Sequence, residues 1–386
     1  MVALEQAVAA PFATRHLADM GARVLKVERP DGGDFARDYD SAVRGMASHF
    51  VWLNRCKESV ALDLKTDAGR DALHVMLGRA DVFVQNLAPG ATGRLGLDAA
   101  SLTARYPRLV VCDMSGYGSS GPYKDKRAYD LLVQSEAGLV SVTGSPEQPA
   151  KAGSPVADIA AGLYAYSGVL AALLQRTRTG RGAALEVSMF DAIAEFMGPA
   201  LYYTQHTGAV PQRAGLSHPT IAPYDAYATS DGGEVVLGVQ NDREWVRFAS
   251  FVLERPDLAT DPAFATNQAR VRNRPAVDAA VAAELATRTL SEALGLLDRH
   301  NIANARVSSV QDLVDHPQLA ARGRWREVGS PVGPLRTLLP VTTLGGAEPR
   351  MDAVPALGEH TASVLLEMGY EQAAVDRVMA PRPGPR

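Results

Sequence analysis

Short runs of apolar and β-branched residues alternate with helical patterns through the first half of the chain. Strands that alternate with helices are typical of a parallel sheet covered on both faces. The pattern therefore predicts an α/β fold. The predicted strands are 2–4, 23–27, 82–84, 109–113 and 183–187, and the predicted helices between them are 11–20, 68–77 and 99–104.

The composition changes after residue 207. Glycine and proline crowd residues 208–225, which predicts a linker or a binding loop. Turn residues 230–233 then precede a predicted strand, and helical patterns follow it, as in a smaller α/β domain. We predict a large domain over 1–207, a linker over 208–225, a small domain over 226–330 and a C-terminal segment over 331–386. The further elements expected are a strand at 235–239, helices at 243–252, 275–286 and 290–299, a β-type stretch at 338–344 and a helix at 361–368.

The longest apolar run, Val156–Leu174, approaches the length of a membrane span, about 20 residues. It contains Asp158, and an ionised carboxylate is costly in the hydrocarbon core. We therefore predict a buried helix of a soluble protein and no association with a membrane. The N-terminal residues lack the pattern of a signal peptide. The two cysteines, Cys56 and Cys112, form no disulfide framework, so we expect a cytoplasmic protein.

The 386 residues carry a formal net charge of −4, which argues against a general nucleic-acid binder. The eight histidines are scattered without the spacing of a metal motif, so we expect no metal. His218 stands out because it lies in the loop-like stretch 214–220. It either binds a carboxylate or orders the loop, and the sequence does not separate the two.

A glycine motif at Gly116–Gly121 matches G-x-G-x-x-G after a predicted strand. In a dinucleotide-binding fold, an apolar helix should follow such a motif and receive the pyrophosphate. The residues that follow, 122–127, are polar and loop-like. We therefore predict a glycine loop and no nicotinamide or flavin cofactor.

Asp158 is the most informative single residue. Ser154 suits a helix N-cap and Pro155 the first helical position, which places Asp158 in the first turn of the apolar helix. Acidic residues in first turns are common because the helix dipole favours them. The rest of this helix is so apolar, however, that the carboxylate would be desolvated and nucleophilic, yet kept ionised by the dipole.

Basic residues recur after the β-type runs. Arg29 and Lys65 each end such a run, Arg94 follows 86–90, and Lys126 and Arg127 follow the glycine loop. In open α/β sheets, ligands bind beyond the carboxyl ends of the strands. Each residue taken alone fits a solvated surface charge, whereas together they fit a site for a phosphorylated ligand.

The chain also resembles the family III CoA-transferases, the CaiB/BaiF family, along nearly its whole length. The matching segments occur in family order and at family spacing, which is highly specific. They are 10–14, 17–30, 53–59, 63–65, 81–86 with 89–90, 116–118 with 121–122, 158–162 and 179–182.

The resemblance implies a large Rossmann-like domain, completed by the C-terminal segment, and an interlocked homodimer. It implies that Asp158 is the nucleophile and that Ala7, Val8 and Ala9 line the reaction site. It further implies that Tyr129, Asp130 and His218 border the acyl group. The positions implied to bind CoA are Arg29, Leu62, Lys65, Asn86, Leu87, Ala88, Arg94, Lys126 and Arg127.

The activity implied is transfer of CoA from an acyl-CoA such as succinyl-CoA to a dicarboxylic acid, through anhydride and aspartyl-CoA thioester intermediates on Asp158. Formyl-CoA transferases have a glutamine where Val8 stands, which disfavours an oxalate-type substrate. One alternative is an acyl-CoA racemase or epimerase acting at the 2-position. Racemases have a histidine where Tyr129 stands, and tyrosine is a poor base at neutral pH. Another alternative is a CoA-binding scaffold without catalysis.

Overall fold

The computed structural model describes residues 1–342 and 344–380, which form two compact units. The first unit contains Met1–Leu139, Lys151–Leu201 and the residues from Arg322 on. The second contains Val140–Ala150 and Tyr202–Ala321. The segment predicted as a linker, 208–225, belongs to the second unit.

Six parallel strands form the sheet of the first unit, in the order β3-β2-β1-β4-β5-β6. Every residue of β1, β2 and β4 is buried, as expected for a parallel sheet with helices on both faces. The predicted parallel α/β sheet is confirmed. Its strands are β1 (Val2–Leu4), β2 (Val24–Glu28), β3 (Lys57–Ala61), β4 (Val82–Gln85), β5 (Val110–Ser115) and β6 (Ala184–Ser188).

The strand order reverses between β1 and β4, and ligands of open α/β sheets bind outside the carboxyl ends of the strands at such a point. The turns after these two strands are joined there. The backbone N–H of Gln6 donates to Asn86 Oδ1 at 2.8 Å, and Asn86 Nδ2 donates to the Gln6 carbonyl at 2.9 Å. Asn86 therefore fixes the position of the turn that follows β1.

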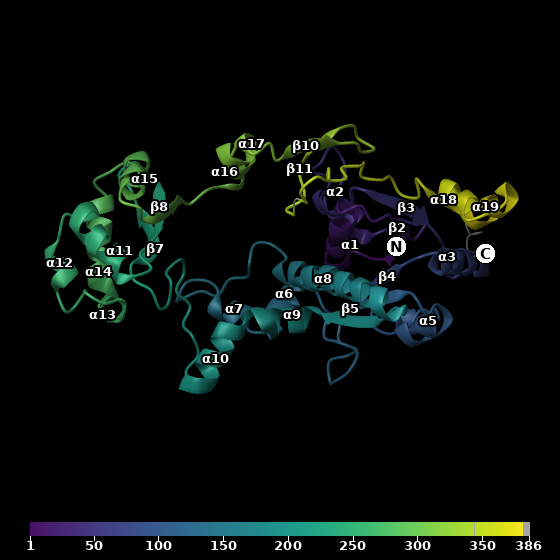
Figure 1. Ribbon diagram of the computed structural model, residues 1–386, viewed down its shortest axis with the longest axis horizontal. Coiled ribbons are helices and arrows are strands. Elements are labelled where there is room, and N and C mark those ends of the chain that lie inside the picture. Colours follow the sequence, from purple (N-terminus) through teal and green to yellow (C-terminus); the bar gives the residue numbers. More distant parts are fainter. Residues whose placement is uncertain (343, 381–386) are drawn as a thin grey trace. The chain divides into compact units, whose positions relative to one another are not determined.

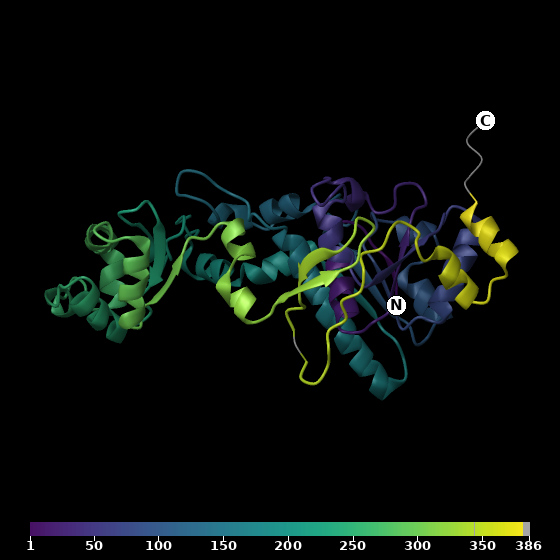
Figure 2. The same cartoon turned by 90° about the horizontal axis from the view of Figure 1, so that it is seen from above.

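Helices cover both faces of this sheet (Figures 1 and 2). One face carries α1 (Ala9–Asp19), α6 (Asp130–Glu136), α8 (Val156–Thr179) and α9 (Met189–Phe196). The other carries α3 (Asp67–Gly78), α5 (Ala99–Arg105), α18 (Thr361–Glu367) and α19 (Gln372–Met379). The yellow C-terminal helices α18 and α19 lie beside α3 in both views, so the two ends of the chain complete one core.

Shorter elements complete the first unit. They are η1 (Phe35–Asp38), α2 (Ser48–Asn54), α4 (Ala91–Arg94) and the antiparallel pair β10 (Trp325–Val328) and β11 (Leu335–Leu338). The predicted strand at 338–344 is wrong for residues 339–342, which are neither helix nor strand, and residue 343 lies outside the described residues. The strand forms earlier because Leu335 and Leu338 pair with Val328 and Trp325.

Helix α8 contains the long apolar run, and only one of its sides is buried. Its alanines pack on α1 and the sheet, whereas Leu163, Leu170 and Leu174 are 43–59% exposed. The predicted burial therefore holds for one side of this helix and not for the other. By length and composition α8 could cross a membrane, but a core helix of a soluble protein passes the same test.

The second unit is built on a three-stranded antiparallel sheet in the order β7-β8-β9. Trp245, Phe248 and Leu237 lie in its core. The predicted helix 243–252 is an α-helix followed by a π-helical turn. The elements of this unit are β7 (Tyr224–Ala228), β8 (Glu234–Gly238), α11 (Asp242–Arg247), η2 (Phe248–Val252), α12 (Asp257–Thr260), α13 (Asn267–Arg272), α14 (Arg274–Leu285), α15 (Leu290–Arg299), β9 (Ala303–Arg306), α16 (Val310–Val314) and α17 (Pro317–Ala321). Two helices, α7 (Leu139–Val142) and α10 (Gly198–Thr207), cross from the first unit into the second.

Candidate active site

Asp158 is the third residue of α8, in its first turn, as predicted. Burial, together with the nearby charge of Asp130, raises the pKa of its carboxyl to about 7. The backbone N–H of Ala9 lies near enough to the carboxylate to oppose this shift. We expected the helix dipole to keep Asp158 ionised. Burial and Asp130 raise its pKa instead, so both forms of the carboxyl are present near neutral pH.

Asp130, the first residue of α6, caps the beginning of α8 from a separate element. Its Oδ1 accepts from the backbone N–H of Ala157 at 2.8 Å and from that of Asp158 at 3.4 Å. The predicted cap by Ser154 is wrong. Pro155 occupies the N-cap position and α8 has no side-chain cap from its own N-cap residue, so Asp130 satisfies the free amides instead.

The turn between β1 and α1 provides the other side of the Asp158 site. Ala7 has a φ of 59°, in the left-handed region that residues with a Cβ rarely adopt. Val8 is the N-cap residue of α1, and its side chain is buried against Phe12 and Leu53. Ala9 begins α1 and presents its N–H to Asp158.

Gly162 lies one turn beyond Asp158 on α8, where the helix approaches this turn closely. A Cβ at Gly162 would lie 2.8 Å from the Ala9 carbonyl oxygen and 3.0 Å from the ring of Phe12. Only glycine allows this approach, which brings the Asp158 carboxylate within reach of the Ala9 N–H.

The predicted CoA-binding residues follow the carboxyl ends of parallel strands, so they share one edge of the sheet. Arg29 follows β2, and its guanidinium donates to the Gly33 carbonyl at 3.2 Å. Lys65 and Arg94 are exposed, as is Ala88, whereas the side chain of Leu62 is buried. The Leu87 N–H donates to Gln85 Oε1 at 2.7 Å.

The glycine loop contains no helix between Ser115 and Asp130, which agrees with the loop prediction. Lys126 Nζ lies 2.8 Å from Glu136 Oε2 and 4.2 Å from the centre of the Tyr123 ring. Arg127 is exposed. Tyr129 is the N-cap residue of α6 and is 63% exposed, so its phenol is open to solvent beside the start of that helix.

Comparison with known proteins identifies the family. The model of CoA-transferase family III matches residues 1–361. The chain belongs to this family. It is similar to the acetyl-CoA:oxalate CoA-transferase of Acetobacter aceti, with 34% identity over 94% of this chain and 93% of that protein. It is also similar to the succinate–glutarate CoA-transferase of Agrobacterium fabrum, with 33% identity over 95% and 94% of the two chains.

A solved structure supports the same assignment. The CAIB/BAIF family protein from Brucella suis has a TM-score of 0.83 and 33% identity, covering 95% of this chain and 97% of its own. The family III relatives are named as CoA-transferases, so this chain is an enzyme of the CoA-transferase type. The resemblance predicted from the sequence motifs is confirmed.

His218 of this family III chain lies in the second unit, apart in sequence from the residues described above. Its ring stacks on Tyr224 with centroids 5.3 Å apart, and its Nδ1 accepts from the Thr220 N–H at 3.2 Å. Its carbonyl accepts from Arg274 Nη2 at 2.6 Å. These contacts show that His218 orders its loop, and a carboxylate-binding role stays a prediction.

Several residues beneath the site carry charge that the sequence analysis did not select. The side chains of Lys26 and Lys57 are fully buried and pair with Glu5, and Lys26 also pairs with Asp34. A sequence signal existed for Lys26, because a lysine in the middle of a buried strand requires a partner. Tyr39 was also missed. Burial raises the pKa of Tyr39 to about 12, and the charges of Asp34 and Asp158 add to this effect, so its phenol lies within electrostatic reach of both.

Proposed function

We propose that the enzyme transfers CoA from succinyl-CoA, or a similar acyl-CoA, to a dicarboxylic acid through covalent intermediates on Asp158. The observation that carries this proposal is the desolvated Asp158 carboxyl with a pKa of about 7. A carboxylate of raised basicity is a better nucleophile, and part of it remains ionised at neutral pH.

In the first half of the reaction, an Asp158 oxygen attacks the thioester carbonyl of the donor. The C–S bond breaks, leaving a mixed anhydride and CoA thiolate. The thiolate then attacks the Asp158 acyl carbon and releases the donor acid as a carboxylate. Asp158 is now an aspartyl-CoA thioester, and no ATP is consumed because each step exchanges one activated acyl group for another.

The second half runs the same steps in reverse with the acceptor. Its carboxylate attacks the aspartyl thioester and releases CoA thiolate, which then attacks the acceptor acyl carbon of the new anhydride. The products are the acceptor thioester and the free Asp158 carboxylate. Backbone N–H groups near the site, in the turn after β1 and the glycine loop, would stabilise the oxyanions that develop.

The CoA-binding assignment made from the sequence is carried forward as part of this proposal. Arg29, Lys65, Arg94 and the residues of the glycine loop lie after strands of one parallel sheet, where cationic groups can meet phosphates. Ala7, Val8 and Ala9, with Tyr129 and Asp130, would border the acyl group. A role of His218, which lies in the second unit, toward the acyl group stays a prediction of the family resemblance.

The acceptor is proposed from chemistry shared with the relatives. Of the relatives named above, one acts on oxalate and one on glutarate, and both acids are dicarboxylates. Val8 argues for an acid longer than oxalate, because its buried apolar side chain offers no hydrogen bond to a compact dianion.

We further propose that the enzyme is an interlocked homodimer in the cytoplasm. The dimer is supported by apolar side chains exposed on α8 and α9 of the single chain, where Leu174 is 59% and Phe196 is 48% exposed. The compartment is supported by Cys56 and Cys112, which are both buried free thiols, as in proteins of reducing compartments.

The test is incubation with succinyl-CoA and a panel of dicarboxylates, with mass spectrometry of the thioesters formed. Asp158→Ala should lower transfer by about 10³-fold or more, because no other group can carry the acyl intermediate. Hydroxylamine added during turnover should convert Asp158 of the wild type to a hydroxamate. Asp191→Ala is the matched control, because Asp191 is likewise the third residue of a helix, α9, but is exposed.

Two outcomes contradict the proposal. One is transfer that survives in Asp158→Ala at the rate of the Asp191→Ala control. The other is deuterium entering a 2-methylacyl-CoA from heavy water without any exchange of acids, which would identify the racemase alternative.

A further inference from the structure

We propose that Asp34 is a positioning residue for the reaction: by holding the Ala7 N–H, it fixes the turn between β1 and α1 so that the Ala9 N–H meets the Asp158 carboxylate. This inference rests on the proposed role of Asp158 and assigns a task to a residue that lies outside the reacting groups.

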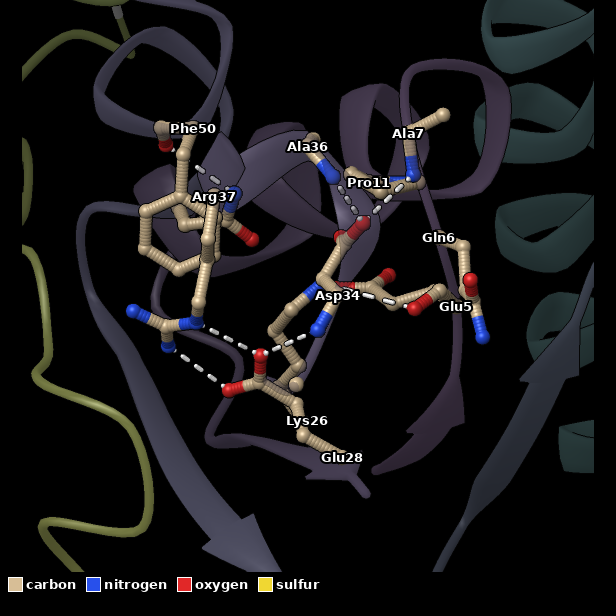
Figure 3. Close-up of polar contacts among 12 residues, drawn as sticks. Glu5, Gln6, Ala7, Pro11, Lys26, Glu28, Asp34, Ala36, Arg37 and Phe50 are labelled. Carbon is tan, nitrogen blue, oxygen red and sulfur yellow. Dashed lines mark hydrogen bonds and ion pairs between the residues drawn. The ribbon is translucent and has the colours of Figure 1, made fainter. Parts of the chain in front are cut away.

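The turn requires an external constraint because Ala7 adopts a left-handed conformation. Asp34 supplies it. Its Oδ1 accepts from the Ala7 N–H at 3.0 Å and from the Ala36 N–H at 2.9 Å (Figure 3). Without an acceptor for the Ala7 N–H, this residue has no reason to leave the more favourable right-handed or extended regions.

Asp34 is itself held by buried charge. Its Oδ2 lies 2.8 Å from Lys26 Nζ, and neither side chain is exposed to solvent. Lys26 also lies 3.3 Å from Glu5 Oε1, and Lys57 Nζ lies 2.7 Å from the same oxygen. Figure 3 shows Asp34 between the backbone of Ala7 and Ala36 and the ammonium of Lys26. We call Glu5, Lys26, Asp34 and Lys57 the buried charge network.

The backbone from Ala7 to Ala9 connects the buried charge network to the reaction site. Asp34 holds Ala7, and the N–H of Ala9 lies near the Asp158 carboxylate, where α8 approaches the turn most closely. Gly162 keeps α8 against the Ala9 carbonyl, so a shift of the turn would move the Ala9 N–H relative to Asp158. A nearby N–H favours the ionised form, so moving the Ala9 N–H away should leave fewer Asp158 carboxyls ionised at neutral pH.

A purely structural role for Asp34 is the competing explanation, and Asp19 provides the comparison. Asp19 is equally buried, pairs with Arg15 and Arg55 and lies at the opposite end of α1 from the turn. If Asp34 served only stability, removing either carboxylate would have the same kind of effect on the enzyme.

The experiment compares two double variants, Lys26→Met/Asp34→Ala and Lys26→Met/Asp34→Asn. Both lack the Lys26–Asp34 ion pair and leave Glu5 paired with Lys57, so neither buries an unpaired charge. They differ in one respect, because asparagine retains an oxygen that can accept from the Ala7 N–H. Asp19→Asn serves as the control for loss of a buried carboxylate elsewhere.

The first readout is the rate at which a water-soluble carbodiimide labels Asp158 as a function of pH, followed by peptide mass spectrometry. The reagent requires the protonated carboxyl, so the midpoint reports ionisation without turnover. The alanine double variant should raise this midpoint by about one pH unit. The asparagine double variant and Asp19→Asn should keep the wild-type midpoint.

The second readout is transfer at pH 7. The alanine double variant should lose about 10²-fold in kcat, the scale of a displacement of about 1 Å in a reacting group, with the KM for acyl-CoA unchanged. The asparagine double variant should recover most of this loss. Equal midpoints and equal kcat values in the two double variants would overturn the inference. The labelling midpoint does not depend on transfer. If Asp158 is not the nucleophile, the shift of this midpoint can therefore still be observed, and the two proposals are tested separately.

Discussion

Burial disfavours the ionised form of two carboxylates, Glu28 and Asp158, but the net effect on their pKa values is opposite. Glu28 accepts from the Asp34 N–H beside the buried charge network, and there Arg37 and Lys26 outweigh burial and lower the pKa of Glu28 to about 2. At Asp158, burial acts together with the negative charge of Asp130 and raises the pKa to about 7. No ion pair of Asp158 occurs among residues 1–342 and 344–380.

The difference distinguishes the carboxylates that hold the backbone in place from the carboxylate that reacts. Carboxylates with a cation within 3 Å are held ionised and fix the backbone, whereas a carboxylate denied a cation keeps its basicity for chemistry. Both kinds act on one turn, because Asp34 accepts from the Ala7 N–H and Asp158 lies near Ala9. The following predictions test whether this contrast is correct.

The largest effect is expected when the network loses a cation. Lys26→Met leaves Asp34 buried without its ion pair, which should lower the free energy of unfolding by about 3–5 kcal/mol. Denaturant unfolding at pH 7 measures it. The control is Arg23→Met just before the same strand, where the pairs with Glu58 and Glu367 are exposed and the change should stay below about 1 kcal/mol. Equal losses in the two variants would contradict the contrast.

A smaller effect of opposite sign is expected at Asp158. Its pKa of about 7 lies above that of the unfolded chain, so ionisation of Asp158 lowers the free energy of unfolding. This loss of stability is small near pH 4, grows as the pH rises and is complete above pH 7. Asp158→Asn removes this cost while it abolishes transfer. The variant should therefore be more stable than the wild type by about 2 kcal/mol at pH 8.

Thermal unfolding at pH 8 and pH 4 tests this prediction. The stabilisation should fall below about 1 kcal/mol at pH 4, where the wild-type carboxyl is protonated in the folded state and about half protonated in the unfolded state. An Asp158→Asn variant that is less stable than the wild type at pH 8 would contradict the prediction, because it would show that neighbouring groups stabilise the ionised carboxylate.

The smallest effect is expected from Asp130→Asn. Asparagine still accepts from the Ala157 N–H, but the negative charge that raises the pKa of Asp158 is gone. The acidic limb of the pH profile of kcat/KM should move to lower pH by up to about one pH unit. Burial should still keep the midpoint of this limb above the ordinary pKa of an aspartate. Gln134→Ala, which removes the other partner of Asp130, should leave the limb in place.

The sequence predicted the elements that depend on local pattern. Buried parallel strands are rich in apolar and β-branched residues, so β1, β2, β4 and β5 were located closely. The β-type run that ends at Lys65 did not locate β3, which spans Lys57–Ala61. Lys57 and Glu58 are unlike strand residues until their ion pairs with Glu5 and Arg23 are known. The first-turn position of Asp158 followed from Pro155 and the apolar run.

Relationships between distant residues could not be predicted in this way. Asp130 caps α8 from 27 residues away, and Asp34 meets Ala7 across an equal separation. Neither contact leaves a periodic trace in the sequence. The electrostatics of Asp158 depend on these contacts, which explains why its position was predicted correctly and its ionisation was not.

The discontinuous first unit has a consequence for synthesis. The six strands of its sheet are complete at Ser188, but the core on the α3 side also needs Val364, Leu365 and Val375. Ribosomes add about 5–20 residues per second, so this apolar face waits on the order of 10 s for its last helices. During that time residues 202–321, which make up most of the second unit, emerge and can fold. The nascent chain therefore presents a partly uncovered apolar face of the sheet until its last helices have been made.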